Sequence, residues 1–333
     1  MNVSMWVKAL QVIPRISKDE WNHLDVISKW LISTRAAVLI MTFLSGAIAG
    51  ILAIKDGKFN LLYWVLLEIG LIMAHGANNL FNDYTDYSKG VDKDNYYRAQ
   101  YGPQPLVHGL MTKRGLLTYF AITGIIAIIP GIFFVAVYRL PALILLALGA
   151  FFVLFYTFPL KYIALGELSV LIVWGPLMIG GGYYVITGNW DWNVVIAGMV
   201  YALGVTTVIF GKHVDKEEMD KEKHIHTLPV LIGEKAGRYT IVAMFILQYL
   251  AVIYLVIIGF FTPILLIVLL SLPVLFKSVL PIYRAPKPSE KPEFFPEVWP
   301  NYFVAAAFYQ NRTFGLWYLL GLIGDVIWRM VIK

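Results

Sequence analysis

Nine long apolar runs, separated by glycines, prolines or clusters of charged residues, divide the chain. Each run approaches the roughly 20 residues that a helix needs to cross the hydrocarbon core of a bilayer. We therefore predict an all-α membrane protein with nine transmembrane helices in a bundle. The predicted spans are Trp30–Ile54, Leu61–Phe81, Leu116–Tyr138, Pro141–Phe158, Glu167–Thr187, Val194–His213, Tyr239–Gly259, Thr262–Ile282 and Thr313–Ile332.

The first 29 residues have a different pattern, in which apolar and charged positions alternate around Trp6, Ile13, Trp21 and Val26. They lack the compact apolar core and the small-residue cleavage site of a signal peptide. We predict that residues 1–29 form an amphipathic segment at the membrane interface. Residues 30–333 would then form one transmembrane domain.

The composition agrees with this pattern, because 59% of the residues are hydrophobic and only 14% are charged. A soluble domain carries about a quarter charged residues, so an ordinary soluble enzyme is excluded. The absence of cysteine excludes disulfides, thiolate metal sites and cysteine nucleophiles.

The net charge of +6 could indicate nucleic acid binding, but lysines and arginines that orient the helices explain it better. Most of these lysines and arginines lie in loops that the predicted spans place on the same side of the membrane as the N-terminus. The positive-inside rule therefore predicts a plasma-membrane protein with a cytoplasmic N-terminus and an external C-terminus. We expect no nucleic acid partner and no obligate protein partner.

A first polar cluster ends the second predicted span and contains Asn82, Asp83, Asp86 and Asp92. Asn82 and Asp86 are four residues apart, so they share one face of a helix. Three carboxylates and an amide within eleven residues supply hard oxygen donors. Such a set suits Mg²⁺, which binds one or two carboxylates together with water and phosphate oxygens.

A second cluster ends the sixth predicted span, where carboxylates at Asp215, Glu218 and Asp220 alternate with lysines such as Lys212 and Lys216. Carboxylates and ammonium groups together can hold a metal and the phosphates that it bridges. The two clusters lie four spans apart on one membrane face, as duplicated four-helix units would place them. We expect them to form a two-metal diphosphate clamp at the mouth of a lipid-open cavity.

With both clusters in view, the chain resembles the UbiA superfamily of intramembrane prenyltransferases over about residues 30–330. The segment 82–86 matches the family motif N-D-x-x-D, and Asp220 stands seven residues before Thr227-Leu228-Pro229-Val230, like the family's last motif aspartate. The segments 89–92, 102–103 and 106–112 are similar to the menaquinone branch, which prenylates dihydroxynaphthoate. Further similarity to that branch lies in 156–162, 165–167, 175–176 and 183–184.

The resemblance implies Mg²⁺-dependent transfer of a polyprenyl group from an isoprenyl diphosphate to an aromatic quinone precursor. The implied roles fall into three sets, with some residues in more than one. The metal ligands would be Asn82, Asp83, Asp86, Asp92, Asp215 and Asp220; the diphosphate ligands would be Asn82, Lys161, Arg35 and Lys212; the catalytic residues would be Asp86, Asp220, Tyr156 and Lys161. The ring of Tyr156 would shield or stabilise the allylic cation, and the loop 96–114 would act as a lid.

The second motif departs from the family's D-x-x-x-D, because Asp215 and Asp220 are five residues apart. Either the first of these has a different register, or Lys216 or Glu217 takes a role there. A second acceptor also stays open, geranylgeranylglyceryl phosphate of archaeal ether-lipid synthesis. From another class, a secondary transporter could use intramembrane carboxylates as well.

Overall fold

The computed structural model describes residues 2–91, 102–293 and 298–332, and it divides the chain into two compact units. Unit 1 comprises Met1–Gly46 and Leu61–Pro159, and unit 2 comprises Ala47–Asn60 and Leu160–Lys333. Every named element of the described residues is helical. The change of unit after Pro159 falls between the fourth and the fifth predicted spans.

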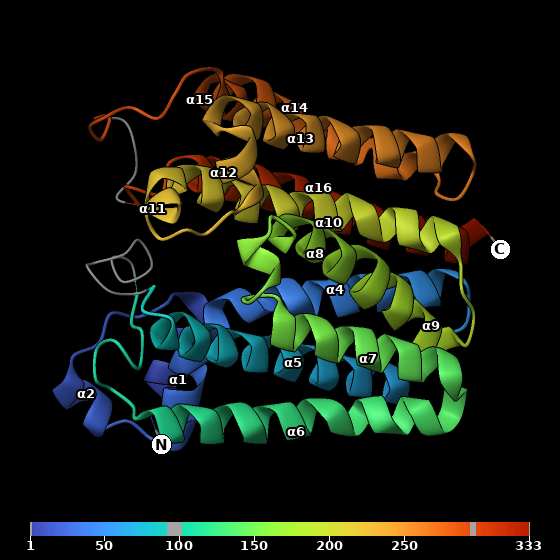
Figure 1. The fold of residues 1–333 in the computed structure, drawn as a ribbon. Helices are drawn as coiled ribbons and strands as arrows, with labels where there is room; N and C mark the ends of the chain where they lie inside the picture. The colour runs from blue at the N-terminus through green and yellow to red at the C-terminus, as the bar shows by residue number, and fades with distance from the viewer. Residues whose placement is uncertain (1, 92–101, 294–297, 333) are drawn as a thin grey trace. The chain divides into compact units, whose positions relative to one another are not determined.

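Unit 1 is built from helices α1 to α7, of which α4 passes on into unit 2. Their bounds are α1 Val3–Gln11, α2 Lys18–Asn22, α3 Val26–Ser33, α4 Ala36–Lys55, α5 Leu61–Ser88, α6 Lys113–Tyr138 and α7 Leu140–Phe155. The long helices α5, α6 and α7 pack against one another (Figure 1). Thr112 begins α6 as its N-cap, since its hydroxyl accepts the Gly115 N–H.

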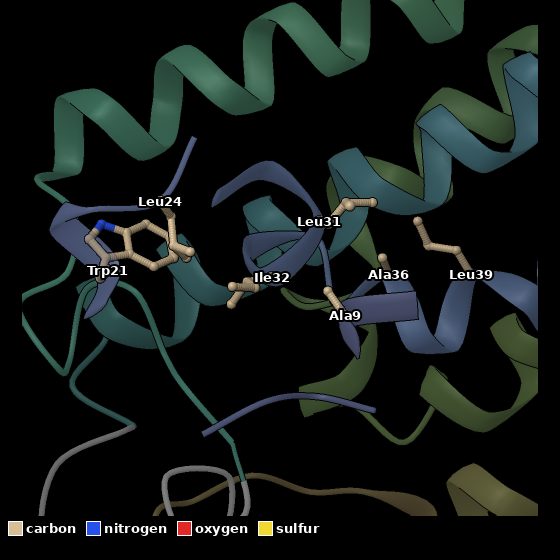
Figure 2. Packing of buried hydrophobic residues seen from close by; sticks show 7 residues of the cluster. All are labelled: Ala9, Trp21, Leu24, Leu31, Ile32, Ala36 and Leu39. Atoms are coloured by element: carbon tan, nitrogen blue, oxygen red, sulfur yellow. The ribbon is translucent and has the colours of Figure 1, made fainter. Parts of the chain in front are cut away.

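The amphipathic N-terminal segment is part of the packed interior of unit 1. Ala9, Trp21 and Leu24 join a buried cluster with residues of α3 and α4, and Figure 2 shows their side chains beside Leu31 and Ile32. Burial of such apolar surface contributes about 25 cal/mol for each Å². The segment is therefore fixed to unit 1 by apolar packing.

Asp25 fixes the same segment through polar contacts. Its carboxylate caps α3 by accepting the Ser28 N–H at 2.8 Å, and it also accepts the Asn2 N–H at 2.5 Å and the Trp6 indole N–H at 3.1 Å. These donors stabilise the ionised form, the Ser28 N–H most strongly, and lower the pKa of Asp25 to about 2.

Unit 2 contains the rest of the helices, together with the second half of α4. Their bounds are η2 Leu160–Tyr162, α8 Gly166–Ile172, η3 Val173–Gly181, α9 Gly182–Thr187, α10 Trp192–Asp215, α11 Glu217–Glu222, α12 Leu228–Ile232, α13 Glu234–Ile257, η4 Pro263–Ser271, α14 Leu272–Val274, η5 Leu275–Val279, α15 Leu280–Arg284 and α16 Phe303–Ile332. The central helix α10 is buried along most of its length and packs against α8, η3, α13 and α16 (Figure 1).

Eight helices of the described residues are long and apolar enough to cross a membrane. The prediction of a multi-span helical membrane protein is therefore confirmed. The fourth predicted span corresponds to α7, which has 16 residues and is shorter than the other eight.

Several predicted bounds were wrong. The first span is interrupted at Arg35 between α3 and α4, and the second continues to Ser88, so Asn82, Asp83 and Asp86 lie on the helix itself. The last span begins ten residues earlier than predicted, at Phe303, which shortens the preceding loop.

We predict that acid detaches the N-terminal segment. The native pKa of Asp25 lies below its ordinary value of 3.8, so its contribution to stability is present above about pH 4 and is lost as the pH falls through about 2. Hydrogen exchange of residues 3–11 should accelerate over that range, and Asp25→Ala should produce the fast exchange at neutral pH. Asp19→Ala, on an exposed position of α2, is the control; equal protection in both variants would contradict the anchoring role of Asp25.

Candidate functional site

Three residues of the first polar cluster, Asn82, Asp83 and Asp86, occupy the last turns of α5 in unit 1. Asp83 and Asp86 are three residues apart on the helix, and they are only 3% and 7% exposed. Asn82, one position before Asp83, is half-buried. Because carboxylates are expensive to bury without compensation, this part of α5 requires positive charge or hydrogen-bond donors nearby.

Arg35 supplies that charge from the break between α3 and α4. Its guanidinium forms an ion pair with Asp83 and donates to the Asn82 side-chain oxygen at 3.2 Å. The backbone of Arg35 has φ +56°, a left-handed conformation that non-glycine residues rarely adopt. The Asn79 amide donates to the Thr34 carbonyl at 2.8 Å, which fixes this break against α5. The helix break thus places a cation against the first cluster.

The end of α7 completes this group within unit 1. The Asn82 side-chain amide donates to the Thr157 hydroxyl at 2.8 Å. Tyr156, the C-cap of α7, is the neighbour of Thr157 and is half-buried. Three of the predicted site residues, Arg35, Asn82 and Asp83, are therefore in direct contact, and Tyr156 lies next to a residue that Asn82 binds.

The donor set of the first cluster suits a hard cation. The second carboxylate oxygen of Asp83 is buried and accepts no hydrogen bond from the described residues. Asn82 and Asp86 add further oxygens from the same two turns of α5, which is the ligand chemistry that Mg²⁺ prefers. Asp92 falls outside the described residues. Within the described ranges, no three His, Asp or Glu side chains lie close enough together to hold a metal by themselves.

In unit 2, the side chain of Asp215 caps the N-terminus of helix α16. Its carboxylate accepts the Phe303 and Val304 N–H groups, both at 3.0 Å, and its side chain is fully buried. These are the first N–H groups of α16, which lack partners within the helix. Lys287 adds an ammonium group 3.5 Å away. Both oxygens of Asp215 are therefore engaged in capping α16.

Asp220 lies in an ion pair with a lysine. The Lys216 ammonium donates to its carboxylate at 2.7 Å, and the two side chains are 4% and 0% exposed. The pair spans one turn at the start of α11. Burial lowers the pKa of Lys216 to about 8, which Asp220 opposes and the positive charges of Lys161 and Lys212 reinforce. Lys161 itself is 6% exposed on η2. The charges of Lys161 and Lys212 thus act on Lys216 near this end of α10.

Sequence reasoning missed a second buried pair in unit 2. His213 Nδ1 lies 2.5 Å from the Glu167 carboxylate, and the same carboxylate oxygen accepts the Leu228 N–H at 3.3 Å. This contact ties together the starts of α8 and α12 and the end of α10. Glu167 at the start of a predicted span was the available signal, because a carboxylate there needs a partner.

The family model of the UbiA prenyltransferase family matches residues 43–311. The UbiA prenyltransferase domain-containing protein 1 of Danio rerio is 26% identical over 228 residues, which cover 66% of this chain and 66% of that protein. The 1,4-dihydroxy-2-naphthoate octaprenyltransferase of Bacillus subtilis is 27% identical over 243 residues, 72% of this chain and 77% of that protein. The UbiA prenyltransferase domain-containing protein 1 of Xenopus tropicalis is 27% identical over 184 residues, which cover only 52% of that protein.

Solved structures share the fold. A UbiA homolog from Archaeoglobus fulgidus, bound to DMAPP and Mg²⁺, aligns with a TM-score of 0.59 at 16% identity, over 88% of this chain and 99% of that chain. A structure of digeranylgeranylglyceryl phosphate synthase also aligns with a TM-score of 0.59, at 17% identity, over 90% of this chain and 98% of that chain.

We predict that Arg35→Gln destabilises unit 1, because it leaves Asp83 buried without its counter-charge. Breaking one side of a buried pair costs about 3–5 kcal/mol, which should appear as a lower midpoint of thermal unfolding in detergent. The double variant Arg35→Gln/Asp83→Asn should regain much of the loss. Arg114→Gln, at an exposed position of α6, is the control. A midpoint equal to wild type in Arg35→Gln would contradict the pairing.

We also predict that Asp215→Ala destabilises the start of α16. Loss of a capping side chain costs about 0.5–2 kcal/mol, so hydrogen exchange at residues 303–306 should accelerate. Glu218→Gln, an exposed carboxylate on α11, serves as the control. Unchanged exchange in Asp215→Ala, together with weaker binding of Mn²⁺ as a Mg²⁺ substitute, would instead assign Asp215 to a metal.

Proposed function

The chain belongs to the UbiA prenyltransferase family, and on that premise we propose that it transfers a polyprenyl group from an isoprenyl diphosphate to an aromatic quinone precursor within the membrane. The observation that carries this proposal is the group formed near one end of α5 by buried Asp83 and Asp86 with half-buried Arg35 and Asn82. Carboxylates, an amide and a guanidinium are the groups that a metal-bound diphosphate requires.

In the proposed reaction, the bond between C1 of the allyl group and the diphosphate oxygen breaks, and both electrons stay on that oxygen. A ring carbon of the acceptor then bonds to C1 and loses its proton. Mg²⁺, held by Asn82, Asp83 and Asp86, would supply positive charge for the leaving diphosphate. Arg35 holds Asp83 in place through their ion pair, and Lys161 and Lys212 donate to phosphate oxygens.

The remaining expected roles extend this proposal. The half-buried ring of Tyr156 would face the allylic cation. A bilayer location suits the substrate, because each CH₂ of a prenyl tail costs about 0.8 kcal/mol to expose to water. We propose a plasma-membrane location with the acidic motifs on the cytoplasmic side, following the distribution of lysines and arginines. The proposed lid, 96–114, lies partly outside the described residues.

One observation favours the phosphoglycerol acceptor as a second candidate. Unit 1 contains a hollow of about 390 Å³ lined by Arg15, Lys18 and His108, beside Gly102 and Pro103. Such a basic pocket would suit the phosphate of geranylgeranylglyceryl phosphate. The similar proteins also include both acceptor types. The Bacillus subtilis relative is named for dihydroxynaphthoate, and one of the solved structures is named for digeranylgeranylglyceryl phosphate.

We predict that Asp86→Asn lowers turnover of geranylgeranyl diphosphate by at least about 100-fold, because it removes a buried charge that a metal-bound diphosphate requires. Mg²⁺-dependent release of pyrophosphate by protein in lipid nanodiscs is the measurement. Asp19→Asn, a carboxylate exposed on α2, is the matched control and should keep wild-type turnover. Wild-type turnover in Asp86→Asn would remove the first cluster from the reaction.

A further inference from the structure

The hollow of about 390 Å³ in unit 1 has a basic lining. Its charged and polar side chains are those of Arg15, Lys18 and His108, and no described residue that lines it is acidic. A guanidinium offers a planar fork of N–H donors and an ammonium offers three more, and both suit phosphate oxygens. The lining therefore fits a phosphate better than a neutral or cationic ligand.

The acidic residues that follow Lys18 in the sequence do not line this hollow. Glu20 accepts the Ser17 N–H at 2.8 Å in the capping box of α2. Asp25 accepts the N–H groups that fix the N-terminal segment, and Asp19 lies at an exposed position of α2. Two of these three carboxylates thus have partners of their own.

Both walls of the hollow are fixed in place. Ile16 and Leu110 line it and also pack against the buried cluster of Figure 2. The segment 104–111 is closed by its own backbone hydrogen bonds, since the Leu110 and Met111 N–H groups donate to the Pro105 carbonyl at 2.8 and 2.9 Å. Fixed walls reduce the ordering that a ligand has to induce, which favours binding.

His108 is oriented by the same segment. Its Nδ1 accepts the Gln104 N–H at 3.0 Å. Because Nδ1 is an acceptor, the proton of the neutral imidazole lies on Nε2. His108 can therefore offer a ligand an N–H donor, in addition to the donors of Arg15 and Lys18.

Helix α6 places the hollow at the depth of the lipid headgroups. It has 26 residues, which span about 39 Å at 1.5 Å per residue, whereas the hydrocarbon core is about 30 Å thick. Its first residues, Lys113 and Arg114, are exposed, and its first exposed large apolar side chain is Ile122. Leu110 stands three residues before α6, outside the hydrocarbon.

Helix α1 offers a lipid surface a second contact. Val3, Val7 and Leu10 share one face of the helix, and each is about half exposed, at 55%, 49% and 55%. The buried Ala9 packs into unit 1 from another face. An exposed apolar stripe on a helix of this kind is typical of insertion into the membrane interface.

We infer that the hollow binds the phosphate of an anionic bilayer phospholipid, through Arg15, Lys18 and the Nε2–H of His108. Charge complementarity and headgroup depth favour this ligand, because anionic lipids attract basic groups at the membrane surface. The inference rests on the proposed aromatic acceptor, which leaves the hollow unused by the reaction. The bound lipid would hold the N-terminal segment and the segment 102–110 together at the bilayer surface.

The first test titrates phosphatidylglycerol into the full-length protein in detergent and counts bound lipids by native mass spectrometry. Wild-type protein should bind one copy more tightly than any further copy. Arg15→Gln/Lys18→Gln should bind that copy roughly 10- to 100-fold more weakly, the value of charge-assisted hydrogen bonds. Lys8→Gln/Lys58→Gln removes the same charge at exposed positions outside the hollow and should bind like wild type. Equal affinities in all three proteins would overturn the inference.

The second test separates a bilayer lipid from a phosphoglycerol substrate. Wild-type protein in phosphatidylcholine nanodiscs receives geranylgeranyl diphosphate, Mg²⁺ and geranylgeranylglyceryl phosphate, and we expect no prenylated glycerol phosphate. Such a product, with a KM for the phosphoglycerol that rises in Arg15→Gln/Lys18→Gln, would overturn the inference and assign the hollow to the acceptor. Tight binding of one phosphatidylglycerol without prenyl transfer to any acceptor would overturn the proposed function alone.

Discussion

Burial of ionised groups together with their counter-charges governs both polar clusters. Asp83 and Asp220 are each almost completely buried, and each contacts a cation, Arg35 in unit 1 and Lys216 in unit 2. An isolated charge in such surroundings costs several kcal/mol, whereas a paired and hydrogen-bonded one is tolerated. These pairs place charged groups near the ends of α5 and α10. The proposed reaction would use charge that is already in place, because preorganised groups do not have to rearrange during a reaction.

The two clusters look alike in the sequence, and each holds a buried carboxylate that forms an ion pair. The first cluster keeps a buried carboxylate oxygen that accepts no hydrogen bond from the described residues, which suits a hard cation. In the second cluster, Asp215 caps a helix and Asp220 and Glu217 each pair with a lysine, while the second carboxylate oxygen of Asp220 is buried like that of Asp83. The five-residue separation of Asp215 and Asp220 has a simple explanation here. Asp215 serves α16, and Lys216 stands four residues before Asp220, which places both side chains on one face of α11.

Hydrophobic pattern predicted the fold class and most spans, because a lipid-exposed helix needs apolar residues all round. It failed where polar residues continue a helix. The last span was predicted to begin after Arg312. In the structure α16 begins at Phe303, and Arg312 lies at an exposed position of this helix. That Asn82, Asp83 and Asp86 lie on one helix was predictable from their spacing, and Arg35 was named as a diphosphate ligand. Its pairing with Asp83 was not predictable, because 48 residues separate them, and the same holds for Glu167 and His213.

The central claim is that this chain transfers a prenyl group inside a membrane. The most direct measurement incubates purified protein in nanodiscs with geranylgeranyl diphosphate, Mg²⁺ and equal amounts of dihydroxynaphthoate and geranylgeranylglyceryl phosphate, and identifies the products by mass spectrometry. The account predicts a prenylated naphthoate product that disappears in EDTA. A prenylated glycerol phosphate alone would shift the acceptor to the second candidate. No prenylated product of either kind, from folded protein that binds pyrophosphate, would contradict the account.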